Sequence, residues 1–413
     1  MEELRVLPGE CVIEPVTDAG REAVEAARRL APFLSEQAAA NDAAGRFAAE
    51  SMARLRDEGV LAVSAPPAAG GLGLTSLHDV SLLVKQLASA DGSVGVAVSM
   101  HLALAVYFAR TVETAEPGSR PAQEQWLDQI GRRLMVLGSA VAEPGAEAWR
   151  PTTTACPAGD GWVISGTKIL VSNSPAATHF YTRLRAERDG GYEMATAMIR
   201  ADAPGVTVLD DWRGLGLRGS GSGAVRFADV AVPAGLVRAG GRWGTPDPTD
   251  FEGRAAASIP IVAAYLGMAE AARDTALTEF AKGRSSPSAR GRSDAVVTQW
   301  QMAELTIALA EATAVFRDAL VRIDDMFRST APRRADVTVG RSLLRDCLIA
   351  SIVVERSANR VIDAAMQICG GRSYTAGHPL ERGYRDVKAA AFMRPFSPPE
   401  RFVEFLLPDS VEA

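Results

Sequence analysis

The chain has 413 residues, of which 47% are hydrophobic, so it can bury a core large enough for two or three domains or one unit of several layers. Its net charge of −6 gives no reason to expect nucleic acid or an anionic membrane as a partner. The N-terminus lacks the order of a signal peptide, and the most apolar run, residues 93–108, is too short to span a bilayer and contains His101. We therefore expect a cytoplasmic protein in which this run is a buried helix.

The first 135 residues have apolar side chains at helical spacing. Residues 17–37 predict a first helix with Thr17 or Asp18 as its N-cap, and a second predicted helix ends at Gly59. After a Pro- and Gly-rich break, residues 77–110 resume the helical pattern. These features predict an N-terminal helical domain over residues 1–135.

From about residue 136 the apolar side chains alternate, which is typical of strands. Residues 161–172 predict a hairpin with a glycine in its turn, and residues 179–200 predict a second hairpin that turns at residues 189–191. Residues 206–212 and 222–233 add two strands. We expect a middle, barrel-like β domain over residues 136–245.

Helical patterns return after a linker rich in Gly and Pro. Residues 259–283, 295–327 and 340–371 predict long helices with wide apolar faces, which pack best as an antiparallel bundle and suit burial between subunits. The expected fold class is α+β and mainly α, with a C-terminal four-helix bundle over residues 246–413.

The cysteines and histidines carry no metal signature. The sequence contains four of each, with no CxxC pair, no HExxH word and no histidines at i, i+4. We expect reduced cysteines and no metal site.

Four sequence motifs carry a resemblance to a known family. They are AVAEPGA at residues 140–146, GDGWVISGTKILVSNSPAATHFYTRLRA at 159–186, GLGLRGSGSGAVRFADVAVP at 214–233 and AAMQICGGRSYTAGHPLERGYRDVKA at 364–389. In this order and spacing they resemble the acyl-CoA dehydrogenase superfamily over nearly the whole chain. The resemblance implies FAD, with FMN possible, bound between the β domain and the C-terminal bundle of a homotetramer.

The resemblance also implies which residues meet the flavin ring. Backbone groups of Val141 and Ala142 would lie at the pyrimidine edge. Ser172 stands where the family has a threonine whose hydroxyl bonds flavin N5, and a serine offers the same donor. The alternative is that Ser172 only ends a strand. Leu170 replaces the family's tryptophan, which indicates a remodelled substrate pocket.

A second set of residues corresponds to the adenine end of FAD, which a neighbouring subunit binds. Gly370 and Gly371 would let backbone amides approach a pyrophosphate, and Gln367 could bond it. Arg284 resembles a basic residue that the partner subunit contributes. The alternatives are a helix stop for the two glycines and a solvated charge at a helix C-terminus for Arg284.

The carboxylate that normally removes the substrate's α-proton is missing. Counting from Arg385-Asp386 places Arg394 at the usual position, and a guanidinium stays protonated and cannot act as a base. The family's other base position falls on Ala257. Glu400 and Glu252 are weak candidates for a replacement base.

Three functions follow from these features. The first is an FAD-dependent dehydrogenase that oxidises an acyl thioester on CoA or an acyl carrier protein and passes electrons to an acceptor, which we place ahead on family frequency. The second is a flavin monooxygenase that oxygenates nitrogen, sulfur or carbon with help from a flavin reductase, and this chemistry needs no base for an α-proton. The third is a non-catalytic subunit that depends on a partner protein.

Overall fold

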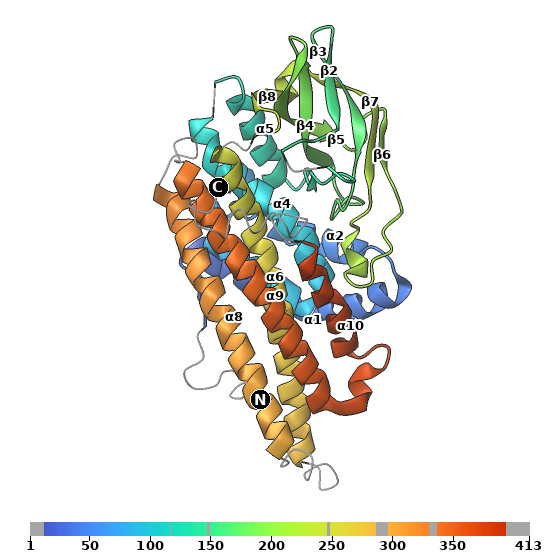
Figure 1. Ribbon diagram of the computed structural model, residues 1–413, viewed down its shortest axis with the longest axis vertical. Helices are drawn as coiled ribbons and strands as arrows, with labels where there is room; N and C mark the ends of the chain where they lie inside the picture. The colour runs from blue at the N-terminus through green and yellow to red at the C-terminus, as the bar shows by residue number, and fades with distance from the viewer. Residues whose placement is uncertain are drawn as a thin grey trace, which may run out of the picture.

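The computed structural model describes residues 12–115, 117–146, 149–245, 248–285, 296–329 and 337–393, without the side chains of residues 248–252, 283–285, 329 and 337. The N-terminal and C-terminal parts of the chain are helical and the part between them is a β domain, so the predicted fold class, α+β and mainly α, is confirmed (Figure 1).

The N-terminal part is helical, as expected. Its helices are α1 (Asp18–Ala44), α2 (Ala49–Asp57), α3 (Leu77–Ala90), α4 (Gly92–Thr111) and α5 (Arg120–Gly131), with short 3-10 turns at Val60–Ala62, Pro67–Ala69 and Val112–Thr114. Thr17 is the N-cap of α1, because its hydroxyl accepts the backbone N–H of Gly20 at 2.9 Å. Gly59 follows α2 with a φ of 79°, a conformation that favours glycine.

The middle part is a twisted mixed sheet. Its strands are β1 (Leu137–Ala140), β2 (Thr154–Ala158), β3 (Gly161–Lys168), β4 (His179–Arg188), β5 (Gly191–Arg200), β6 (Val206–Val208), β7 (Val225–Pro233) and β8 (Val237–Arg242). They are ordered β6-β7-β3-β2-β4-β5-β8, and β1 pairs with β4 in parallel. A core of its own fills the β domain, built around Ile164, Phe180 and Phe227.

Of the two predicted hairpins, one is confirmed and one is wrong. Strands β4 and β5 pair antiparallel and turn at Asp189 and Gly190, both of which have positive φ. Residues 161–168, by contrast, form the single strand β3, which pairs with β2 and β7. Its Gly166 is not a turn residue but marks a register shift in the pairing with β7, where a Cβ would lie 2.4 Å from the Thr153 hydroxyl.

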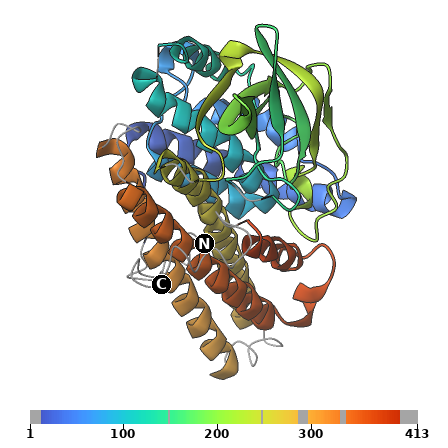
Figure 2. The ribbon, with the colours of Figure 1, turned by 45° about the horizontal axis from the view of Figure 1, so that its top comes forward.

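The C-terminal part is a bundle of α6 (Pro248–Ser285), α8 (Val296–Ser329), α9 (Val337–Cys369) and the short α10 (Pro379–Val387), with 3-10 turns at Gly370–Tyr374 and Lys388–Ala391. Helices α6, α8 and α9 run side by side and extend away from the β domain (Figures 1 and 2). Helix α6 also packs on α3, where Gly267 allows close approach, because a Cβ there would lie 2.2 Å from the carbonyl oxygen of Lys85. One hydrophobic core therefore joins the N-terminal helices to the bundle.

Two buried side chains join elements that are far apart in the sequence. His101 on α4 donates from Nε2 to the carbonyl of Leu61 at 2.7 Å and accepts the N–H of Leu137, the first residue of β1, at 3.0 Å. Burial lowers the pKa of His101 to about 4, so the ring is neutral at pH 7. Asp324 on α8 accepts the N–H groups of Leu77 and His78 at the start of α3.

Segments 92–114 and 253–282 are long and apolar enough to span a membrane by length and composition alone, so the expectation that the run around His101 is too short for this is wrong. In both, 78% of the most apolar window is buried inside the fold, as in the core helices of a soluble protein.

Candidate functional site

Two loops of the β domain lie side by side and bring Ser172 into a buried position. The backbone N–H groups of Val171, Asn173 and Ser174 donate to the carbonyl oxygens of Gly223, Ser220 and Gly221, at 3.1, 2.9 and 3.2 Å. These bonds hold residues 171–174 against residues 220–223 beyond the end of β3.

Within this pair of loops, three serine hydroxyls form a chain. Ser172 Oγ lies 2.9 Å from Ser222 Oγ, which lies 2.7 Å from Ser220 Oγ. The exposed fractions of Ser172, Ser222 and Ser220 are 4%, 2% and 0%. Ser172 therefore does more than end a strand, because its hydroxyl belongs to a buried polar network.

The neighbouring side chain, Asn173, is fully buried, and neither its amide oxygen nor its amide nitrogen has a hydrogen-bond partner in the described part of the chain. Such a group costs stability unless a ligand or water satisfies it. Its φ of 66° is unusual for a residue other than glycine, and such conformations cluster at functional sites.

Val141 and Ala142 follow β1 next to the same loops. Ala142 is exposed, and its carbonyl oxygen accepts the N–H of Ile169 at 2.9 Å. Leu170 is 47% exposed and also has a positive φ, of 54°. An open, partly apolar surface therefore lies directly beside the buried serines.

A buried ion pair fixes the residue that follows Ala142. Lys168 Nζ donates to Glu143 Oε1 at 2.6 Å, and Glu143 also accepts the N–H groups of Thr152 and Thr153. Burial raises the pKa of Glu143, but the Lys168 ammonium and these hydrogen bonds outweigh it and lower the pKa to about 2. Glu143 is therefore a fixed anion that positions the segment after Ala142, and it is not a candidate base.

Helix α6 lies against the segment between β1 and β2. Trp149, buried in the segment between β1 and β2, carries the guanidinium of Arg254 at 4.3 Å from its ring centre. Ala257, one turn further along α6, is exposed and offers no acid or base. The second position at which the resemblance predicts a base therefore lies on an accessible surface and is empty of a carboxylate.

Helix α10 borders the same loops from the other side. The carboxylate of Asp386 accepts the N–H of Leu217 at 2.6 Å. Arg385 bonds Glu381, four positions earlier in α10, at 2.7 Å and Asp42 on α1 at 2.9 Å, so the three side chains form one charged cluster. Burial raises the pKa of Asp386 to about 7.

The residues expected at the adenine end of a flavin lie elsewhere, at the junction of α9 and the following 3-10 turn. Gln367 is exposed and its side-chain oxygen accepts a bond from Gln301 at 2.8 Å. Gly370 ends the helix with a φ of 72°, and Gly371 is exposed with nothing within 4 Å of a Cβ. This surface is open to a ligand or to another subunit.

Four further candidates lie outside what the structure describes. Arg394 and Glu400 fall after its last described residue, and Glu252 and Arg284 belong to α6 but their side chains are not described.

The described residues hold no metal site beside these groups. Within the described ranges, no three or more His, Cys, Asp or Glu side chains are arranged to hold a metal ion. Cys156, Cys347 and Cys369 are free thiols.

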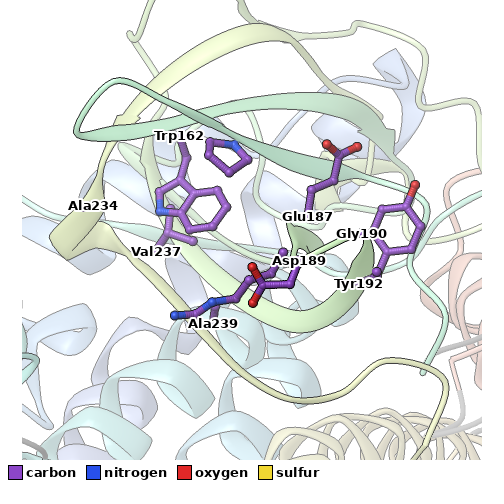
Figure 3. Close-up of a pocket in the computed structure, with 11 residues that line it drawn as sticks. Trp162, Glu187, Asp189, Gly190, Tyr192, Ala234, Val237 and Ala239 are labelled. Carbon is purple, nitrogen blue, oxygen red and sulfur yellow. The ribbon is translucent and has the colours of Figure 1, made fainter.

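A cavity of about 850 Å³ lies at the far end of the β domain. Trp162 and Tyr192 stand on opposite sides of it, with Glu187 beside Tyr192 (Figure 3). It opens at the start of β3, whereas Ser172 follows the end of that strand, so this cavity is not part of the site.

The described residues fit a flavin ring beside residues 141–142 and 170–173. The hydroxyl of Ser172 can bond a ring nitrogen, and the buried amide of Asn173 is a polar group that lacks a partner. Ser220, Ser222, Asn173 and Arg254 were not predicted from the sequence. The repeated SGSG at residues 220–223 was the available signal for two of them.

The sequence matches family models along three consecutive parts. These describe the N-terminal, middle and C-terminal domains of acyl-CoA dehydrogenase, and they match residues 17–132, 138–230 and 259–397.

Individual relatives are similar over almost the full length. Amino sugar nitrososynthase RubN8 of Streptomyces rubradiris is 34% identical over 387 residues, which are 92% of this chain and 88% of that protein. The crystal structure of a nitrososynthase from Micromonospora carbonacea var. africana has a TM-score of 0.88 and 32% identity, covering 97% of this chain and 98% of that one. KijD3 in complex with FMN and dTDP-3-amino-2,3,6-trideoxy-4-keto-3-methyl-D-glucose has a TM-score of 0.87 and 31% identity, covering 95% and 93%.

Proposed function

Since this chain belongs to the acyl-CoA dehydrogenase family, we propose that it is a flavin-dependent N-oxygenase whose substrate is an amino sugar carried on a nucleoside diphosphate. It is an enzyme and a flavin-dependent oxidoreductase that acts on a small molecule, as the sequence predicts. The choice of reaction and substrate is the proposal.

One observation carries the choice of reaction. Ala257 lies on an exposed face of α6 and cannot remove an α-proton, and the sequence has Arg394 at the family's other base position. Dehydrogenation of an acyl thioester needs such a base, because the α-proton must leave as hydride departs from the β-carbon. Oxygenation of an amine does not, since the amine nitrogen is itself the nucleophile.

The choice of substrate rests on the relatives and on charge. RubN8 acts on an amino sugar by name, and KijD3 binds an amino sugar on dTDP. Arg254 would supply the cation that a diphosphate needs, because a guanidinium forms paired hydrogen bonds to phosphate oxygens. Its position one turn before the exposed Ala257 on α6 supports this role.

The proposed reaction balances with oxygen and two electrons per step. In the first step R–NH₂, O₂, two electrons and two protons give R–NHOH and water. In a second step R–NHOH, O₂, two electrons and two protons give R–N=O and two waters. The electrons and the activation of oxygen in both steps would come from a bound reduced flavin.

The residues of this chain would bind and orient the reactants. Ser172 would bond flavin N5, and the backbone of Val141 and Ala142 would meet the pyrimidine edge. The cofactor is a flavin, and we propose FMN, which KijD3 also binds. With FMN, Gln367, Gly370 and Gly371 would have no adenine end to contact and would serve subunit packing.

We further propose a cytoplasmic homotetramer that receives reduced flavin from a separate reductase. The end of the bundle supports the assembly, because Val296, Val297, Trp300 and Tyr374 are 79%, 66%, 66% and 83% exposed. Large apolar side chains gathered near one end of a helix bundle are typical of an interface between subunits.

The test is turnover with FMN, NADH, a flavin reductase, oxygen and a dTDP-linked amino sugar, followed by mass spectrometry. A product heavier by one oxygen, and then one that has lost two hydrogens from it, is expected. The Ser172→Ala variant should keep the fold and alter the flavin spectrum. Anaerobic bleaching of the flavin by an acyl-CoA, without any oxygenated sugar, would support the dehydrogenase instead.

A further inference from the structure

The hydrogen bonds among the three buried serines can run in either of two directions. Each hydroxyl has one hydrogen to donate and lone pairs to accept. Ser222 lies between the other two, so in a continuous chain it accepts from one neighbour and donates to the other. The chain can therefore run from Ser220 to Ser172 or in the reverse direction.

The direction of the chain decides what Ser172 can offer. When Ser222 donates to Ser172, the Ser172 hydrogen is free to be donated outward. When Ser172 donates to Ser222, only its lone pairs face outward, and it can then accept a hydrogen bond.

We propose that Ser222, with Ser220 behind it, is a positioning residue that lets Ser172 bond flavin N5 in both oxidation states. Oxidised flavin has a lone pair at N5 and needs a donor, whereas reduced flavin has an N5–H and needs an acceptor. Rotation of the three hydroxyls switches Ser172 between these roles, with no proton leaving any oxygen. This inference rests on the proposed contact of Ser172 with N5.

The surroundings of the chain favour this arrangement. All three hydroxyls are buried, so bulk water does not readily replace a lost partner. The backbone bonds from Asn173 to Ser220 and from Ser174 to Gly221 fix the spacing of the two loops. The oxygen atoms therefore stay within hydrogen-bond distance while their hydrogens rotate.

The two oxidation states depend on Ser222 unequally. With reduced flavin, the Ser172 hydrogen must be donated to Ser222, and removing that acceptor leaves a buried donor unsatisfied. With oxidised flavin, Ser172 loses only a donor to its oxygen, while its own hydrogen remains bonded to N5. A buried hydrogen-bond donor without a partner costs more free energy than an oxygen lone pair without one.

The experiment measures the midpoint potential and absorption spectrum of the bound flavin in the Ser222→Ala variant. The affinity for reduced flavin relative to oxidised flavin should fall by about tenfold, which makes the two-electron potential about 30 mV more negative. Ser220→Ala should shift the potential in the same direction by less. Ser222→Thr, which restores the hydroxyl, should return it toward the wild-type value.

Ser174→Ala is the matched control. Ser174 is a buried serine in the same loop, but its hydroxyl donates to the carbonyl of Gly221 at 3.0 Å and is not part of the chain. Its removal should leave the potential unchanged. Equal shifts in Ser174→Ala and Ser222→Ala would overturn the inference, because they would reflect a general loosening of the loops.

A double variant separates this inference from the proposed function. If Ser222 acts through Ser172, adding Ser222→Ala to Ser172→Ala should produce no further shift. If Ser172→Ala alone leaves the spectrum and potential unchanged, the contact with N5 is wrong. If Ser172→Ala alters both but Ser222→Ala alters neither, the contact stands and the positioning role is wrong.

Discussion

Asp386 and Leu217 connect the end of the bundle to the serine loops through a single buried hydrogen bond of 2.6 Å. Leu217 has a φ of 50°, and its carbonyl oxygen accepts the N–H of Ser220 at 3.0 Å and the indole N–H of Trp212 at 2.9 Å. Asp386 thus holds a strained residue in the turn that positions the first hydroxyl of the chain. This bond couples α10 to the turn that leads to Ser220 and Ser222.

Asp386→Asn should change how stability depends on pH. Burial raises the pKa of Asp386 from its ordinary value to about 7, and Asp91 and Asp42 oppose its ionisation while Arg382 favours it. The folded state therefore binds this proton more tightly than the unfolded state does. The contribution of the group to stability is present below pH 3.8 and is lost as pH rises through about 7.

The asparagine keeps an oxygen to accept the Leu217 N–H but cannot ionise. The free energy of unfolding of the variant, relative to wild type, should be higher at pH 8 than at pH 5 in urea titrations. Asp128→Asn, at an exposed ion pair on α5, is the control and should show a nearly constant difference. A constant difference for Asp386→Asn as well would mean that this carboxyl is already charged at pH 5.

Lys168→Met should lower the free energy of unfolding by about 3–5 kcal/mol, because it leaves Glu143 as a buried and unpaired charge. The double variant Lys168→Met/Glu143→Gln should recover part of this loss. Urea denaturation of the four proteins forms a double-mutant cycle. Additive losses, with no recovery, would show that the two side chains do not depend on each other.

The limits of sequence reasoning are visible in single residues. The β4–β5 turn was predictable because Asp189-Gly190 suits two consecutive positive φ values, whereas Gly166 gave a false turn signal because a glycine also permits close approach to Thr153. The bond between Arg385 and Glu381 follows from their i, i+4 spacing. No local pattern could reveal that Arg385 also binds Asp42, far away in the sequence.

The same limit applies to the site. Ser172 could be predicted because it lies in a sequence motif of the family. Its partner Ser222 lies 50 positions later, in a different motif, and only the pairing of the two loops brings the hydroxyls together. Non-local contacts of this kind come from the pairing of the two loops and not from any local residue pattern.

Gly267→Ala should destabilise the fold although alanine favours helices. The new methyl carbon would lie 2.2 Å from the carbonyl oxygen of Lys85, so α3 and α6 must separate, at a cost of about 1–3 kcal/mol. Gly253→Ala on the same helix is the control, because nothing lies within 4 Å of its Cβ and the variant should gain up to about 1 kcal/mol. Thermal unfolding of both variants gives the comparison. Similar melting temperatures would show that the two helices can adjust to the extra carbon.

Arg254→Gln should weaken binding of the nucleotide part of the proposed substrate. Its guanidinium lies over Trp149 and one turn from the exposed Ala257, where a diphosphate would pass along α6. Losing a charge-assisted hydrogen bond costs about 1.5–3 kcal/mol, so KM should rise roughly tenfold to a hundredfold with little change in kcat. Titration with dTDP alone reports the same loss without any turnover. Lys282→Gln, an exposed cation on the distant part of α6, should leave both values unchanged. A fall in kcat at unchanged KM, with normal dTDP binding, would place Arg254 outside the nucleotide site and leave the diphosphate without its proposed cation.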